Sequence, residues 1–319
     1  QVLREKVALA LTGMMHMLFS RDKRFSLSKE PDPEQIAGAE PLATKRVILV
    51  RHGESLWNGV FNKSPMLFMP IRLIVALLRE ALILFDLDSI FLDSPLSPLG
   101  RAQARELATF LSQCADNPKL AGSETVQRDV QAINAMGGSS SVVVSSMLRR
   151  AVTTAWIALE ARLGASAGRE PMLLHSSLQE MSRNVDTLSI APAHAAPGLS
   201  AAAGEFGVVP DLSHCTSARF NTGNKAVSAV ALARVKGFAG WCCARPEDTL
   251  VVVGHSFYFR LLFKLWLPRA VDHIAKKKKI VNCGVVGFTL KQARLPNGAL
   301  HYRIDPDSIT VVHGGFGGK

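Results

Sequence analysis

The sequence predicts an α/β protein in which helices cover both faces of a mostly parallel sheet. Apolar runs with the length of buried strands stand at 47–50, 142–144, 172–174 and 250–253. Segments with a helical pattern separate these runs, and strands that alternate with helices are typical of parallel sheets. The chain has 319 residues, of which 48% are hydrophobic, which is enough for one large domain with a sizeable core. We therefore expect a three-layer α/β/α sandwich.

Residues 1–44 are expected to form a helical and linker extension that precedes the domain. Apolar runs at 7–11 and 14–19 follow Arg4 and Lys6, and the chain then becomes polar. A basic start before a short apolar run also fits a secretory signal, but no small-residue cleavage site follows this one. We favour a docking or terminal helix.

The domain itself is expected to span 45–312, with a mobile tail at 313–319. Ser97 can cap a helix that starts at Pro98, because serine is a favoured N-cap and proline fits the first helical position. Further helices are expected at 149–163, 225–241 and 257–267, and a further strand at 285–290. Three insertions are expected at about 59–92, 116–140 and 185–222. The second, polar and rich in Gly and Ser, is expected on the surface, and the third, rich in Ala, Pro, Gly and Ser, as a long loop or cap over the site.

The most apolar part of the first insertion is the segment 66–88. Arg72, Arg79 and Asp86 are spaced seven residues apart, so they fall on one narrow stripe of a helix whose other sides are apolar. The charges leave no run of ~20 uncharged residues that could span a membrane. We expect a core or lid helix here, and a homodimer contact or attachment to a membrane surface are the alternatives.

A histidine follows the first expected strand directly. The segment Arg51-His52-Gly53-Glu54 comes after the apolar run 47–50. A histidine at the end of a buried strand, with an arginine before it and a glycine after it, can present its ring to a phosphorus atom while backbone groups approach closely. This arrangement suits a nucleophile that forms phosphohistidine.

The same segment begins a series of five motifs that resembles the histidine phosphatase superfamily, the phosphoglycerate-mutase-like proteins. The motifs stand in the family's order at 51–58, 93–104, 145–155, 178–180 and 251–256. One Arg-His-Gly segment alone is a weak signal, whereas five ordered motifs are specific. The resemblance covers residues 45 to 290 and implies the phosphoglycerate-mutase-like form of the α/β sandwich.

Phosphoryl transfer needs a nucleophile, cations around the phosphate oxygens and an acid for the leaving oxygen. A guanidinium group suits the second role, because it fits phosphate oxygens bidentately. Arg150 is preferred to Arg149, since the family pattern places its arginine directly before Ala151. The resemblance thus implies five catalytic residues: His52 as nucleophile, Glu180 as general acid, and Arg51, Arg150 and His255 as the phosphate clamp.

Further contacts to the phosphate or the substrate are expected from Gly53, Glu54, Asn58 and Ser256. Glu54 is also the second choice for the general acid, because it adjoins the nucleophile. We expect no metal and no organic cofactor. Histidines and arginines take the role that Mg²⁺ has in other phosphoryl-transfer sites, and the cysteines lack the spacing of a zinc site.

These features predict a phosphomonoesterase that acts on a small or protein-borne phosphate ester. A phosphoglycerate mutase is the nearest alternative, but mutases of the family carry Arg-His-Tyr-Gly after the acidic residue, where this chain has residues 181–184 as Met-Ser-Arg-Asn. A second alternative is an inactive protein that keeps the fold to bind a phosphorylated partner. Specificity is expected to lie in 59–92 and 185–222, where no motif is recognised.

The charge balance fits an anionic partner. Lys and Arg number 37 against 26 Asp and Glu, which gives a formal charge of +11. We expect a phosphorylated small molecule or a phosphoprotein, and not a nucleic acid, because aromatic residues are not interleaved with the basic ones. The run Lys276–Lys279 can gather acidic substrates, contact anionic lipid, resemble a nuclear signal or form a solvated loop.

The number of cysteines, 5, is odd, and none of them forms a CxxC pair. This cysteine usage fits a reducing compartment such as the cytoplasm.

Overall fold

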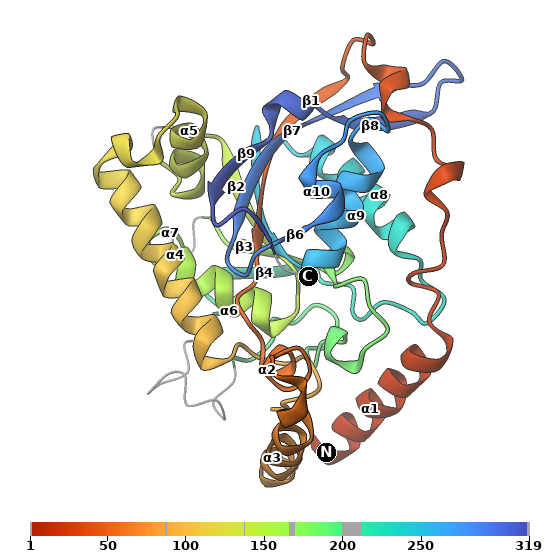
Figure 1. Cartoon of the computed structure of the whole chain (residues 1–319), viewed down its shortest axis with the longest axis vertical. Helices are drawn as coiled ribbons and strands as arrows, with labels where there is room; N and C mark the ends of the chain where they lie inside the picture. The colour runs from red at the N-terminus through yellow and green to blue at the C-terminus, as the bar shows by residue number, and fades with distance from the viewer. Residues whose placement is uncertain (1, 87, 137, 166–169, 200–211, 318–319) are drawn as a thin grey trace.

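A computed structural model describes residues 2–86, 88–136, 138–165, 170–199 and 212–317. Its centre is an 8-stranded sheet with the strand order β4-β3-β2-β5-β1-β7-β8, in which β9 also pairs with β7 (Figure 1). The strands are β1 (Ala43–Arg51), β2 (Ser141–Ser145), β3 (Met172–His175), β4 (Thr216–Phe220), β5 (Thr249–Gly254), β7 (Val285–Arg294), β8 (Leu300–Ile304) and β9 (Thr310–His313). From β4 to β1 all neighbours are parallel, and the pairings of β7 are antiparallel. The prediction of a mostly parallel sheet is confirmed.

Helices cover both faces of this sheet. In Figure 1 one layer lies to its left and the other to its right. The first layer contains α4 (Pro98–Asp116), α5 (Glu124–Ile133), α6 (Arg149–Ala158) and α7 (Glu160–Ala165), and the second contains α8 (Ala231–Ala244), α9 (Ser256–Trp266) and α10 (Ile274–Lys277). The predicted three-layer α/β/α sandwich is therefore confirmed.

Residues of the central strand β1 alternate between the two cores. Ile48 packs with the helices of the first layer and Leu49 with those of the second, and both side chains are fully buried. A strand covered on both faces must be apolar on both, which is why 47–50 reads as a continuous hydrophobic run. The helix α4 begins as predicted, with the Ser97 hydroxyl accepting the Gly100 N–H at 3.0 Å and Pro98 in the first turn.

All three expected insertions contain regular structure in the residues that the structure describes. In the first, the short helix α2 (Leu56–Phe61) precedes α3 (Met69–Leu82). In the second, expected on the surface, α5 packs Val130 and Ile133 into the core. The third is described only at 185–199 and 212–222, and it contributes the edge strand β4, which the sequence pattern did not predict.

The predicted N-terminal helix is present as α1 (Val2–Phe19), at the lower end of the molecule (Figure 1). The segment that follows is fastened to the domain through Asp22. This buried carboxylate accepts hydrogen bonds from Lys225 and Arg234, both at 2.7 Å. Among the helices that the structure describes, none has the length and apolar character needed to cross a bilayer.

The tail expected at 313–319 contains a short strand in the part that is described. Phe316–Gly317 forms the strand β10, which pairs antiparallel with β6 (Lys279–Ile280). Residues 318–319 lie outside the described residues. The lysine run 276–279 does not form a solvated loop. Lys276 and Lys277 are the last residues of α10, and Lys279 is the first residue of β6.

Candidate active site

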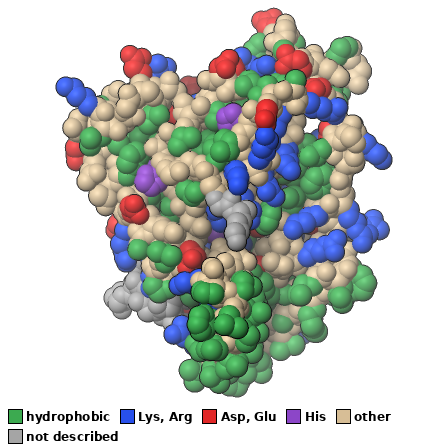
Figure 2. Space-filling model, in the orientation of Figure 1, with side chains coloured by type: hydrophobic (Ala, Val, Ile, Leu, Met, Phe, Trp, Pro, Cys, Tyr) green, Lys and Arg blue, Asp and Glu red, His purple; other side chains and the backbone are tan. Residues whose placement is uncertain are grey.

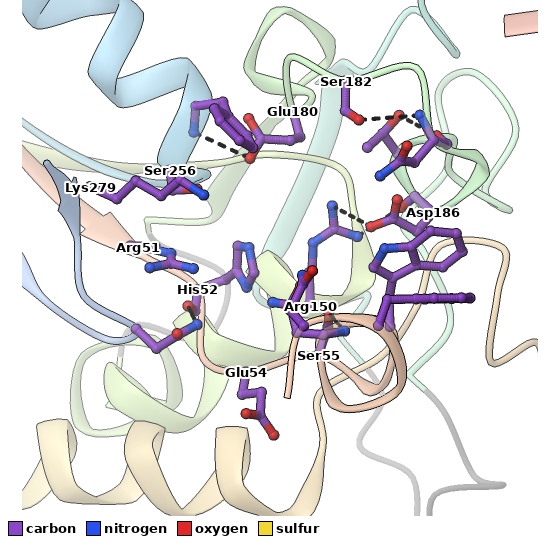
Figure 3. A pocket seen from close by; sticks show the side chains of 18 of the residues that line it. Arg51, His52, Glu54, Ser55, Arg150, Glu180, Ser182, Asp186, Ser256 and Lys279 are labelled. Atoms are coloured by element: carbon purple, nitrogen blue, oxygen red, sulfur yellow. Dashed lines mark hydrogen bonds and ion pairs between the residues drawn. The ribbon is translucent and has the colours of Figure 1, made fainter. Parts of the chain in front are cut away.

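A cavity of about 750 Å³ opens beyond the carboxyl end of β1. Parallel sheets bind ligands at this edge. The walls bring together residues that lie far apart in the sequence, among them His52, Arg150, Glu180 and Lys279 (Figure 3). The predicted catalytic motifs therefore converge on one place.

His52 is the first residue after β1, and its ring is almost fully buried. Its Nδ1 atom lies 2.6 Å from the carbonyl oxygen of Gly53. Because a carbonyl only accepts, Nδ1 must carry the proton, and Nε2 is left with a free lone pair. Burial, followed by the charges of Arg150 and Arg51, holds the pKa of His52 well below its usual value of 6.5. The ring is therefore neutral at physiological pH, as a nucleophile must be.

His255 follows β5, the parallel neighbour of β1, and its ring centroid lies 5.0 Å from that of His52. The residue is fully buried, and its Nε2 lies 2.9 Å from the Ser146 hydroxyl. Burial and the charge of Arg150 lower its pKa well below 6.5. His255 was expected in the phosphate clamp, but it is not among the residues that line the cavity.

Arg51 and Arg150 lie on opposite sides of the His52 ring (Figure 3). Arg51 donates to the carbonyl of Ile280 at 2.7 Å, and its buried Nε has no partner among the described residues. Arg150, in the first turn of α6, donates to the carbonyl of Asp186 at 2.8 Å and lies 3.5 Å from the Asp186 carboxylate. The two guanidinium groups can thus contact different oxygens of one phosphate.

Glu180 lies in the cavity wall but serves as a cap for α9. Its Oε1 accepts the N–H groups of Met181 at 2.8 Å and Tyr258 at 3.1 Å, and its Oε2 accepts that of Phe257 at 3.3 Å. Backbone N–H groups at a helix start are natural partners of a carboxylate. Both oxygens of the expected general acid are therefore occupied by donors.

Asp186 is a carboxylate of the cavity wall that sequence reasoning missed. Its side chain is buried, and its Oδ1 has no hydrogen-bond partner in the part of the chain that the structure describes. Burial raises the pKa of Asp186 to about 6, against the opposing effect of Arg150. A carboxyl group that is protonated at mildly acidic pH, beside an arginine that can contact a phosphate, has the properties of a general acid.

Of the other four residues predicted to contact the phosphate or substrate, three line the cavity and one does not. Asn58 and Ser256 line the cavity. Glu54 also borders it, but its carboxylate accepts the Ser97 hydroxyl at 2.8 Å and points away from His52 (Figure 3). Gly53 does not line the cavity, and its N–H donates to the Thr154 hydroxyl at 3.0 Å. A Cβ there would lie 2.5 Å from the Gly100 carbonyl oxygen, so the close approach requires glycine.

Three cations surround one aromatic ring of the cavity wall. The Lys279 Nζ lies 4.0 Å from the centroid of Phe257, the Lys23 Nζ 4.9 Å and the Arg260 Cζ 5.2 Å. None of the three forms a salt bridge with a residue that the structure describes. Burial and the nearby charge of Arg51 lower the pKa of Lys279. This group, which we call the rim cations, adds positive charge around Phe257 in the cavity wall.

Part of the cavity wall is apolar. Trp57 and Phe61 from α2 pack with ring centroids 4.4 Å apart, and both line the cavity together with Met66. In the described part of the chain, no group of three or more His, Cys, Asp or Glu side chains is arranged to hold a metal ion.

No protein-family model and no curated protein matches the chain. Among solved structures, a mycobacterial glucosyl-3-phosphoglycerate phosphatase in complex with VO3 is similar at 18% identity and a TM-score of 0.39, over 82% of this chain and 97% of that one. A protein called mycobacterial hydrolase 1 has 18% identity and a TM-score of 0.37, over 82% and 97%. A protein from Thermus thermophilus has 18% identity and a TM-score of 0.31, over 82% and 99%. Because these similarities are low, we base the function on the residues of this chain.

Proposed function

We propose that this chain is a phosphomonoesterase of the histidine phosphatase type, with a covalent phosphohistidine on His52. The observation that carries the proposal is the bond from His52 Nδ1 to the carbonyl of Gly53. This bond fixes the tautomer whose Nε2 lone pair can attack phosphorus. The two flanking arginines, Arg51 and Arg150, supply the charge that a phosphoryl group needs during transfer.

In the first step, the Nε2 lone pair of His52 forms a bond to phosphorus while the bond from phosphorus to the ester oxygen breaks. The leaving oxygen takes a proton from a carboxylic acid of the wall. In the second step, water attacks the phosphohistidine, the bond between phosphorus and nitrogen breaks, and the proton of the water goes to the same carboxylate. Inorganic phosphate and the alcohol are the products.

Asp186 and Glu180 are the two carboxylates that can donate this proton. The bonds of Glu180 to three backbone N–H groups favour a structural role. Asp186 has a pKa of about 6 and an oxygen without a partner among the described residues, which support it as the acid. We therefore assign the proton transfer to Asp186 and the positioning of α9 to Glu180.

The rim cations support a substrate that carries more negative charge than one phosphate group. A simple phosphate monoester is already neutralised by Arg51 and Arg150. Lys23, Arg260 and Lys279 provide three further charges around Phe257. We assign them to a second negative group on the substrate, such as a carboxylate or a further phosphate.

The covalent intermediate can be tested directly. The protein is mixed with an aryl phosphate, denatured at alkaline pH, where phosphohistidine survives, and digested for mass spectrometry. We expect one added phosphoryl group on the peptide that contains His52, and none in the His52→Ala protein. Release of phosphate without any labelled peptide would contradict the mechanism. Transfer of the label to an added alcohol at the expense of hydrolysis would identify a phosphotransferase instead.

A further inference from the structure

Exposed apolar side chains are concentrated on two helices at one end of the molecule. The structure describes 26 large hydrophobic side chains that are exposed, and 19 of them lie in α1 or in residues 66–85, which contain α3. Figure 2 shows the apolar side chains that cover the lower end of the molecule, over α3. We call the exposed apolar faces of α1 and residues 66–85 the apolar end. Patches of this size on a soluble monomer mark an interaction site.

The orientation of α1 is the reverse of that in an ordinary surface helix. The side that faces the protein contains Lys6, Gly13 and His16, whereas Leu11 and Leu18 are 53% and 66% exposed. Gly13 allows the helix to approach closely, since a Cβ there would lie 2.6 Å from Val185. A helix that turns its polar side chains inward and its apolar ones outward needs an apolar partner outside the chain.

The helix α3 exposes apolar side chains around most of its circumference. Leu82 is 83% exposed and Leu78 64%, and Ala76 is the one buried residue among those the structure describes in this helix. Lys6 joins this helix to α1, because its Nζ lies 3.2 Å from the Glu80 carboxylate and donates to the carbonyl of Ile83 at 2.8 Å. The two helices therefore present their apolar faces as one connected surface.

Cations flank the apolar end. The exposed basic side chains in residues 2–24 and 63–86 are Arg4, Arg21, Lys23, Arg24, Lys63 and Arg79, against the exposed acids Glu5 and Asp86. An apolar helical surface with a basic border has the chemistry of an interfacial membrane anchor, in which the apolar side chains enter the acyl region and the cations contact anionic headgroups.

We propose that the apolar end docks on the surface of an anionic lipid bilayer. The helices lie in the interface and do not cross it, since none of the described helices is long and apolar enough to span. A second copy of the chain is a poorer occupant. A two-fold axis would place the same patch of both copies face to face, together with the same cations, and their repulsion would oppose the contact.

Docking would bring the bilayer next to the cavity. Met66, which begins the apolar segment, lines the cavity. The helix α1 packs on the turn Val185–Thr187, which contains the proposed acid Asp186. The apolar end thus contributes one residue to the cavity wall and contacts the turn that contains another. The proposed docking does not depend on the proposed catalytic mechanism.

Vesicle flotation with the full chain tests this proposal. The vesicles contain phosphatidylcholine alone or with phosphatidylserine. We expect binding to the anionic vesicles, weaker binding at high salt, and little binding to phosphatidylcholine. The double variant Leu78→Glu with Leu82→Glu should lose most of the binding, with a partition coefficient at least roughly tenfold lower, since each leucine loses its apolar burial. Arg24→Gln and Arg79→Gln should each lower it about fivefold, the factor for one cation near an anionic surface.

Matched controls are Leu120→Glu and Leu300→Glu, two leucines that are 57% and 48% exposed outside the apolar end. These controls should bind vesicles like the parent protein. His52→Ala should also bind normally, so that a failure of the catalytic proposal stays separate from a failure of docking. Equal loss of binding in the controls would overturn the proposal. So would a concentration-dependent dimer in sedimentation equilibrium that Leu78→Glu with Leu82→Glu dissociates, because it would identify a second copy as the occupant.

Discussion

Arg149 and Arg150 are neighbours at the start of α6, yet their guanidinium groups serve different parts of the molecule. Arg150 lies in the wall of the cavity. Arg149 is buried, donates to the carbonyls of Asp93 at 2.9 Å and Ser89 at 2.7 Å, and pairs with the carboxylate of Asp88. Arg150 therefore lines the cavity, whereas Arg149 holds residues 88–93, which connect α3 to α4.

The two arginines should give opposite phenotypes when each is replaced by alanine. Arg149→Ala leaves buried acceptors without a donor, so we expect the free energy of unfolding to fall by about 3–5 kcal/mol. Arg150→Ala removes fewer bonds, those to the carbonyl and carboxylate of Asp186, so it should cost less stability than Arg149→Ala. It should lower kcat/KM for an aryl phosphate by roughly 10²–10³-fold, as for other lost transition-state donors. Urea denaturation and steady-state kinetics on both variants test this. A reversed pattern would exchange their roles.

The nucleophile assignment predicts the phenotype of His52→Ala. The covalent intermediate needs the lone pair of this ring, so turnover of an aryl phosphate should be abolished. The replacement removes a neutral ring, because the pKa of His52 lies well below 6.5, and it should therefore not unbalance the charge of the site at neutral pH. A variant that keeps more than about a tenth of the parent kcat, a barrier change of only ~1.4 kcal/mol, contradicts the assignment.

Much of the fold and part of the site could be predicted from the sequence, for physical reasons that differ by element. The central strand β1 is buried on both faces, so its run of apolar residues is unmistakable. The strand β4, Thr216–Phe220, lies at the sheet edge and is only partly buried, and its sequence Thr-Ser-Ala-Arg-Phe carries no clear period. The pattern that identifies a core strand is absent from such an edge.

The same distinction applies to the catalytic residues. His52 follows a strand and belongs to a motif, so its position in the chain already indicates its role. Asp186 has no motif, and its raised pKa comes from burial, against the opposing charge of Arg150, which lies 36 residues earlier. A perturbed carboxyl group of this kind is recognised only after the chain has folded. Glu180 shows the converse case, because the family pattern alone does not reveal that both its oxygens cap α9.

Activity should not require a divalent ion. The reason is chemical, since Arg51 and Arg150 occupy the positions where a metal would neutralise phosphate charge. We expect the same kcat/KM for an aryl phosphate before and after treatment with EDTA. A loss that Mg²⁺, Mn²⁺ or Zn²⁺ restores would count against the mechanism as a whole.

The rim cations predict which substrates bind well. Lys279→Ala should raise KM for a phosphate ester that carries a second negative group by roughly tenfold or more, because a charge-assisted hydrogen bond is worth about 1.5–3 kcal/mol. The KM for a phenyl phosphate without such a group should change little. The matched control is Lys278→Ala, since Lys278 is the exposed neighbour that does not line the cavity. Equal changes for both substrates would show that Lys279 contributes only to the phosphate position.

The last prediction decides between the two carboxylates of the wall. A general acid matters most for a poor leaving group, because an alkoxide needs its proton in the transition state whereas an activated phenolate departs without one. Asp186→Asn should therefore slow an alkyl phosphate by ~10²–10⁴-fold more than an activated aryl phosphate. Glu180→Gln, the corresponding amide replacement in the same cavity, should slow both substrates alike, because it weakens the cap of α9.

The pH dependence gives an independent reading of the same assignment. The pKa of Asp186 is raised to about 6, so its proton-donating form is present below that pH and is lost as the pH rises through it. For the parent protein, kcat/KM on an alkyl phosphate should fall above pH 6 relative to the value for an activated aryl phosphate, once both rates are corrected for ionisation of each substrate's own phosphate. His52 adds no change in this range, since its pKa lies well below 6.5. In Asp186→Asn the ratio of the two rates should become independent of pH. If the ratio stays pH-dependent in that variant and becomes flat in Glu180→Gln, the proton comes from Glu180.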